Sequence, residues 1–129
     1  MGGVKAEDRP GIGIMGAGAI GLYVGGMLAE AGAQVVFAAR GRTRDSLSRG
    51  LSLSRYDGFK ASLKPERYEV GGVDSLGTCD AVLFCTKSGD TEAAALDLAR
   101  VLKADATVIS LQNGVGNVEM LKRLLPHNQ

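Results

Sequence analysis

The stretch that decides the fold runs from residue 12 to residue 21 and reads Ile12-Gly13-Ile14-Met15-Gly16-Ala17-Gly18-Ala19-Ile20-Gly21. Its first four residues form an apolar run that predicts a strand, and Gly16–Gly21 match the pattern Gly-x-Gly-x-x-Gly. The apolar residues that follow recur at helical spacing, on one face: Ile20, Val24, Leu28 and Ala31. We therefore predict a helix over 19–31, ended by Gly32. Strand, glycine loop and helix in this order are typical of a dinucleotide-binding βαβ unit.

The three glycines of this pattern have different physical tasks. The first makes a tight turn, the second lets the backbone approach a pyrophosphate, and the third lets helix and strand pack closely. Amides at the start of the helix then point at the phosphates. We expect the pyrophosphate to be held by Gly16, Ala17, Gly18, Ala19, Ile20 and Gly21. A second match, over residues 11–16, has no strand before it, so the later match is favoured.

Arg40 follows Gly21 by nineteen residues and indicates which dinucleotide is bound. NAD-binding versions of the unit place an Asp or Glu roughly 20 residues beyond the glycines, where it accepts hydrogen bonds from the ribose 2′-hydroxyl. A carboxylate there would repel a 2′-phosphate, whereas a guanidinium is a planar, permanently charged fork suited to phosphate. Arg42 and Arg44 follow closely, with Thr43 between them. The expected cofactor is NADPH.

Composition limits the class of protein. The 129 residues are 45% hydrophobic, which favours one folded domain over 10–129, preceded by a loose polar leader over 1–9. With 15 basic and 14 acidic residues, nothing indicates nucleic acid or a membrane surface as a partner. No apolar segment has the length of a membrane span or of a signal peptide.

The cysteines and the single histidine argue against a disulfide framework or a metal site. Cys85 lies in an apolar run and is expected to be a buried core residue, and His127 lies among polar residues near the C-terminus. These features fit a reducing, cytoplasmic location.

Apolar runs and helical patterns alternate along the chain, which predicts a doubly wound α/β fold with a mostly parallel sheet. Strands are expected over 12–15, 34–39, 80–85 and 107–111, and helices over 19–31, 90–102 and 118–125, with a further short helix over 43–49. Asp90 and Asn117 are suitable N-cap residues. Asp57-Gly58 predicts a two-residue turn joining strands over 51–56 and 59–63 in a small inserted hairpin.

Ligands of an open parallel sheet bind at the carboxyl ends of its strands. After the third and fourth predicted strands come Thr86-Lys87-Ser88 and Gln112-Asn113-Gly114-Val115-Gly116-Asn117. Lys87 and Asn113 are therefore candidates for contact with the nicotinamide end of the cofactor or with the substrate. Each has a simpler explanation, because a lysine after a strand is often only solvated and Asn113-Gly114 can be only a turn.

The chain resembles the N-terminal domain of the ketopantoate reductase (2-dehydropantoate 2-reductase) family over residues 10–125. Three motifs agree in order and spacing: residues 16–21, 86–88 and 112–119. The resemblance implies that Lys87 and Asn113 contact NADPH and help to shape the 2-oxoacid site, that Thr86 belongs to the cofactor site, and that Arg40 binds the 2′-phosphate. It implies hydride transfer from NADPH to a 2-oxoacid, giving pantoate.

Members of this family continue into a helical C-terminal domain, which supplies the lysine that protonates the reduced carbonyl. The resemblance therefore implies that this chain lacks the general acid, holds no catalytic residue and is inactive alone. We also expect an open sheet edge, which favours self-association. Two alternatives remain: a related NADP-dependent 2-oxoacid reductase, and a non-catalytic NADPH-binding module.

Overall fold

Strand β1 (Gly11–Met15) is the central strand of a five-stranded sheet in the computed structural model, which describes residues 11–55, 57–112 and 116–125. The strands run in the order β5-β2-β1-β6-β7, and all neighbouring pairs are parallel. Their bounds are Gln34–Ala38 for β2, Glu69–Gly71 for β5, Ala81–Phe84 for β6 and Thr107–Ser110 for β7. Because the strand order reverses between β1 and β6, a ligand site is expected at the carboxyl ends of these two strands.

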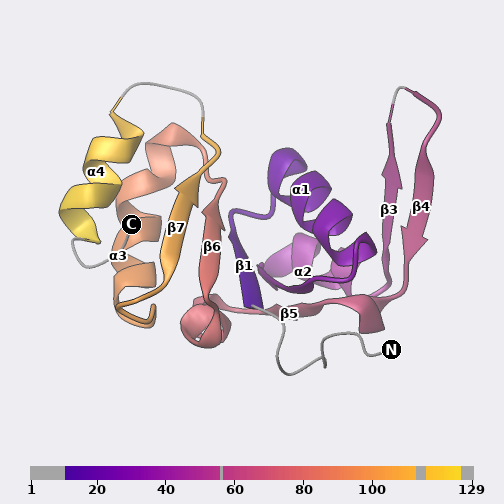
Figure 1. The fold of residues 1–129 in the computed structure, drawn as a ribbon, viewed down its shortest axis with the longest axis horizontal. Coiled ribbons are helices and arrows are strands. Elements are labelled where there is room, and N and C mark those ends of the chain that lie inside the picture. Colours follow the sequence, from indigo (N-terminus) through magenta and orange to yellow (C-terminus); the bar gives the residue numbers. More distant parts are fainter. Residues whose placement is uncertain (1–10, 56, 113–115, 126–129) are drawn as a thin grey trace, which may run out of the picture.

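Helices cover both faces of the sheet, which confirms the doubly wound α/β fold (Figure 1). Helices α1 (Ala19–Glu30) and α2 (Gly41–Leu47) pack on one face together with a hairpin of β3 (Leu51–Ser54) and β4 (Lys60–Leu63). Helices α3 (Thr91–Ala99) and α4 (Asn117–Leu124) pack on the other. Three short 3-10 helices complete the described chain: Pro65–Arg67, Val73–Thr78 and Ser88–Asp90.

Helix α1 approaches the sheet most closely through glycines, and the predicted apolar face is only partly buried. Ile20 is 49% exposed, whereas the buried residues of α1 are Gly21, Gly25, Gly26 and Ala29. A Cβ atom at Gly25 would lie 2.5 Å from Cε1 of Phe37 and 2.9 Å from Cγ1 of Ile14. The helix therefore lies closer to the sheet than any side chain at position 25 allows. The predicted face is therefore confirmed only in part: Val24 and Leu28 pack against the core, whereas the closest approach to the sheet is made by glycines, which contribute nothing to the pattern of large apolar residues.

The edge strand β5 was not predicted from the sequence. It comprises only Glu69, Val70 and Gly71, of which Gly71 alone is buried, so it lacks the apolar run of the inner strands. It forms because β2 offers a free edge, with which Val70 aligns opposite Phe37. The sheet therefore has one more strand than expected, and this strand forms through its pairing with β2 rather than through local propensity.

The hairpin is confirmed, but its strands pair over a shorter range than predicted. Strands β3 and β4 pair antiparallel, with Ser54 opposite Lys60, and the Arg55 amide donates to the Phe59 carbonyl at 2.9 Å. The pairing therefore ends at Arg55 and Phe59, one residue earlier in the first strand than predicted, and Gly58 before Phe59 has a φ of +96°. Glycine adopts this conformation readily, which suits it to the end of a hairpin loop. The guanidinium of Arg55 lies 4.5 Å from the centre of the Phe59 ring.

Cys79 is more deeply buried than Cys85, the cysteine that was expected to be a buried core residue. Cys79 is 1% exposed, and burial together with the charge of Asp80 raises the pKa of its thiol to about 11. Cys85 follows β6 at the carboxyl edge of the sheet, where it is half-buried and packs against the core, and burial raises its pKa as well. Both are free thiols and are largely protonated at neutral pH.

Strand β7 is hydrogen-bonded to β6 alone among the strands that the structure describes, and its Ile109 is 44% exposed. Self-association through this edge stays a prediction. No helix in the described part of the chain is long and apolar enough to cross a membrane.

Candidate functional site

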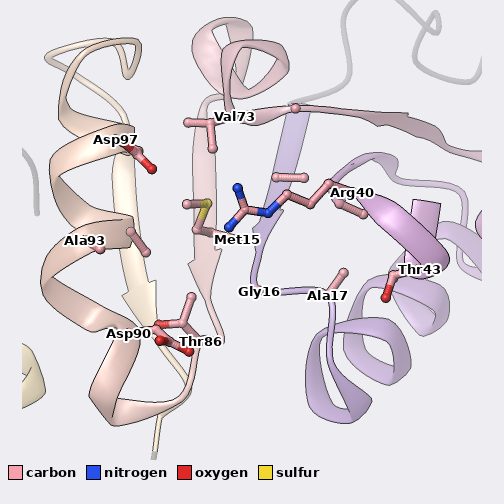
Figure 2. Close-up of a pocket in the computed structure, with 14 residues that line it drawn as sticks. Met15, Gly16, Ala17, Arg40, Thr43, Val73, Thr86, Asp90, Ala93 and Asp97 are labelled. Atoms are coloured by element: carbon pink, nitrogen blue, oxygen red, sulfur yellow. The ribbon is translucent and has the colours of Figure 1, made fainter.

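A cleft of about 480 Å³ opens between the glycine loop and α3, on the α3 face of the sheet (Figure 2). One wall is formed by the end of β1 and the glycine loop, with Met15, Gly16 and Ala17. The start of α2 continues this wall with Arg40 and Thr43. The opposite wall is helix α3, and Gly72, Val73 and Thr86 line the cleft between the walls. The cleft therefore lies at the switch point of the sheet, where ligands of this fold bind.

The three glycines of the loop have the geometry that their predicted tasks require. Gly16 has a φ of +99°, and a Cβ atom there would lie 2.6 Å from the Thr86 amide nitrogen. Gly18 is extended, with φ −88° and ψ −163°, and a Cβ atom there would have no neighbour within 4 Å. A Cβ atom at Gly21 would overlap the Gly16 carbonyl oxygen. The loop thus turns at its first glycine, faces open space at its second and packs tightly at its third.

The start of α1 leaves backbone amides for a ligand. The first hydrogen bond of the helix runs from the Leu22 amide to the Gly18 carbonyl at 2.9 Å. The amides of Ala19, Ile20 and Gly21 precede this bond, so the helix itself supplies no acceptor for them. Ala19 and Ile20 are exposed at this point. An anion beside the loop would therefore meet unpaired donors and the positive end of the helix dipole.

Arg40 is the cation of the cleft. It follows β2 and occupies the N-cap position of α2. Its guanidinium extends into the cleft towards Met15 (Figure 2). Among the described residues it has no hydrogen bond or ion pair. The neighbouring Arg42 and Arg44 are exposed on α2 and do not line the cleft. The position after β2 therefore places in the cleft a positive charge that forms no ion pair with a described residue.

The structure brings together only part of the predicted site. Gly16, Ala17, Arg40 and Thr86 line the same cleft. Lys87 is exposed beyond the end of β6 and does not line it. Asn113 lies outside the described residues, so its predicted contacts with cofactor and substrate are not tested.

The sequence did not predict the role of Gln112, whose side chain joins the ends of β6 and β7. Its Nε2 atom donates to the Thr86 carbonyl at 3.0 Å, to Thr86 Oγ1 at 3.0 Å and to Thr91 Oγ1 at 2.7 Å. Its Oε1 atom accepts a hydrogen bond from Ser110 Oγ at 3.0 Å. These contacts fix the orientation of the amide. A flipped amide would place its oxygen against the Thr86 carbonyl oxygen, which can only accept a hydrogen bond.

Asn117 belongs to the same network and is not the N-cap that was predicted. It is 5% exposed and is the first residue of α4, while Gly116, with a φ of +85°, occupies the N-cap position. The Thr91 hydroxyl donates to Asn117 Oδ1 at 3.0 Å and so joins α3 to α4. This hydrogen bond satisfies the side-chain oxygen of Asn117, so the amide can be buried inside the fold instead of lying at a solvated helix end.

Helix α3 contributes two carboxylates to the cleft that sequence reasoning assigned no role there. Asp90 and Asp97 line the cleft with Ala93 and Ala94 between them. Asp90 takes the predicted N-cap position, but its side chain forms no capping hydrogen bond. The sequence signal for this wall of the cleft was the spacing of Asp90, Ala93, Ala94 and Asp97. It places these four residues on one helix face. Among the described residues, no group of His, Cys, Asp or Glu side chains could hold a metal ion.

The sequence profile described as "Ketopantoate reductase PanE/ApbA" matches residues 12–129. The chain belongs to the ketopantoate reductase family. Two curated relatives bear the name 2-dehydropantoate 2-reductase. The one from Archaeoglobus fulgidus is 40% identical over 111 residues, covering 85% of this chain and 34% of the relative. The one from Pyrococcus horikoshii is 38% identical over 112 residues, covering 86% of this chain and 35% of the relative.

A crystal structure of a PanE/ApbA family ketopantoate reductase from Ralstonia eutropha superposes on this chain with a TM-score of 0.82. It is 40% identical in sequence, and the match covers 89% of this chain and 38% of that one. The resemblance drawn from the sequence motifs is thus confirmed at the level of family and fold. The chain spans about a third of the length of the ketopantoate reductases it matches.

Proposed function

We propose that this chain is the NADPH-binding domain of a 2-dehydropantoate 2-reductase. The observation that carries the proposal is the unpaired guanidinium of Arg40 in a cleft whose other end is an open glycine loop. One feature fits a phosphate at the ribose end, and the other fits the pyrophosphate of the same molecule. Family membership supports the proposal, since the curated relatives bear the name of that enzyme.

The distribution of charge also supports an anionic ligand. The segment from Arg40 to Arg67 carries eight Lys and Arg residues against three Asp and Glu, although the whole chain has a net charge of only +1. This segment begins at the wall of the cleft that holds Arg40. A positive region beside a cleft raises the local concentration of an anion such as a dinucleotide.

In the proposed site each part of the chain has a separate task. The loop amides of residues 16–21 hold the pyrophosphate, and Arg40 binds the 2′-phosphate. Thr86 lines the cleft and belongs to the same cofactor site. Lys87 and Asn113 follow β6 and β7, and we assign them to the nicotinamide ribose and the 2-oxoacid. Bound NADPH would supply the hydride for reduction of the keto carbon. The two free thiols suit a reducing compartment such as the cytoplasm, which stays a prediction.

Replacing Arg40 by Ala should weaken NADPH binding roughly ten- to a hundredfold, because a charge-assisted hydrogen bond contributes about 1.5–3 kcal/mol. NADH lacks the 2′-phosphate, so its affinity should hardly change. Calorimetric titration of both cofactors into both chains measures the effect. Arg44→Ala is the matched control, since Arg44 is exposed on the same helix outside the cleft. Equal losses for the two cofactors would refute the assignment of Arg40.

The 129-residue chain should bind NADPH without oxidising it in the presence of 2-dehydropantoate. Hydride donor, substrate and proton source must be held together, and positioning alone can account for about 7–11 kcal/mol of a barrier. The proposed site holds the donor and, at Lys87, one wall of a substrate site. Loss of NADPH absorbance measures turnover. Clear turnover would place the general acid within these residues and would make Lys87 the first candidate.

A further inference from the structure

We propose that the Thr86 hydroxyl donates a hydrogen bond to the bound dinucleotide, and that Gln112 sets the direction of this bond without touching the ligand. The inference rests on the proposed function, because it assumes that the dinucleotide occupies the cleft lined by Thr86. Gln112 does not line that cleft. It would therefore be a positioning residue, acting on the cofactor through Thr86.

The argument starts from the donors and acceptors of the Gln112 amide. Its nitrogen carries two hydrogens and faces three acceptors. The shortest contact is 2.7 Å to Thr91 Oγ1, and the two contacts to Thr86, with Oγ1 and with the carbonyl, are both 3.0 Å. One hydrogen therefore serves Thr91 and the other is shared by the two oxygens of Thr86. In each of these contacts the threonine oxygen is the acceptor.

The neighbouring groups keep the amide in this polarity. Ser110 Oγ donates to Gln112 Oε1, so the oxygen of the amide is directed away from Thr86. The Thr91 hydroxyl accepts a hydrogen bond from Gln112 and donates one to Asn117 Oδ1 at 3.0 Å. Asn117 and Thr91 are 5% and 0% exposed, so this part of the network is shielded from competing water. A buried network in which each member has a partner holds a single arrangement.

The consequence concerns the proton of the Thr86 hydroxyl. Because Oγ1 accepts from Gln112, its proton must point elsewhere, and no described residue accepts it. Asp90, the N-cap residue of α3, lines the same cleft (Figure 2), but among the described residues it forms no hydrogen bond with the Thr86 hydroxyl. Thr86 lines the cleft and abuts the glycine loop, where a Cβ atom at Gly16 would lie 2.6 Å from its amide nitrogen. The hydroxyl is therefore a ready donor for an acceptor oxygen in the pyrophosphate region.

A double-mutant cycle of Thr86→Val and Gln112→Glu tests the inference, with NADPH affinity measured by calorimetry and folding checked by thermal unfolding. Val removes the hydroxyl at nearly constant shape. Glu preserves the shape of Gln112 but, when ionised, accepts the Thr86 proton and withdraws it from the cleft. Each single change should weaken NADPH binding roughly tenfold, as expected for the loss of one hydrogen bond to a charged group. The double change should weaken it no further, because both act on the same bond.

Two further variants make the result decisive. Thr86→Ser keeps the hydroxyl and should retain nearly full affinity. Gln112→Met replaces the amide by an apolar side chain of similar length, and it serves if the Glu variant does not fold. Additive losses in the cycle, or an unchanged affinity in Thr86→Val, would overturn the inference. Failure of the wild-type chain to bind NADPH would instead refute the proposed function, so the two failures are distinguishable.

Discussion

In the Gly18→Val chain we expect NADPH binding to fall below detection while the fold stays intact. The space beside Gly18 holds no protein atom within 4 Å of a Cβ atom, and its backbone is extended, so valine is accommodated without a clash. The same space is where the pyrophosphate would approach the backbone, and a valine side chain would fill it. A loss of at least about a hundredfold in affinity, roughly 2.7 kcal/mol or more, should be visible by calorimetry.

Gly11→Val is the matched control, since Gly11 begins the competing glycine pattern. Gly11 is the first residue of β1, and a Cβ atom there would make ordinary contacts, 3.6 Å from the Cys79 Cα and 3.8 Å from the Thr78 carbonyl oxygen. Its NADPH affinity should match that of the wild type. If Gly11→Val abolished binding in a folded chain while Gly18→Val bound normally, the assignment of the glycine loop would be wrong.

Features that depend on local sequence were predicted correctly. The inner strands are apolar runs, and the predicted ranges 12–15 and 34–39 agree within one residue with β1 and β2. The glycine loop could also be predicted from the sequence, because the backbone of Gly16 is in a conformation that disfavours other residues. Arg40 was found because its distance along the chain from the loop is set by one helix and one strand.

Features that depend on contacts between distant residues were missed. Strand β5 exists because β2 has a free edge, and nothing in its three residues shows this. Gln112 lies 26 residues from Thr86 and 21 from Thr91, so their hydrogen bonds become visible only when the ends of β6 and β7 are placed side by side. The residue type of Asn117 predicts a helix cap, whereas its burial depends on the contact with Thr91 of α3.

The contact of α1 with the sheet leads to a second large effect. Gly25→Val should lower the free energy of unfolding by about 3 kcal/mol, the upper end of the usual cost of overpacking, because a β-branched residue adds crowding. The Cβ atom alone would lie 2.5 Å from Phe37, which is fully buried. Phe37 cannot easily yield, since its ring packs edge-on against Tyr68 with centroids 5.4 Å apart. Tyr68 is itself fixed by a hydrogen bond of 2.6 Å from its hydroxyl to the Leu47 carbonyl.

Denaturant unfolding of three further variants shows whether the Phe37 ring is the cause. Gly72→Ala is the control for loss of glycine, because its Cβ atom would meet nothing within 4 Å, and its stability should stay within about 0.5 kcal/mol of the wild type. Phe37→Leu removes the ring and destabilises the chain by itself. Combined with Gly25→Val, however, it should recover part of the loss, since the smaller side chain vacates the space that valine needs. Strictly additive losses would mean that α1 can move away from the sheet, and that the contact with the Phe37 ring is not the cause of the destabilisation.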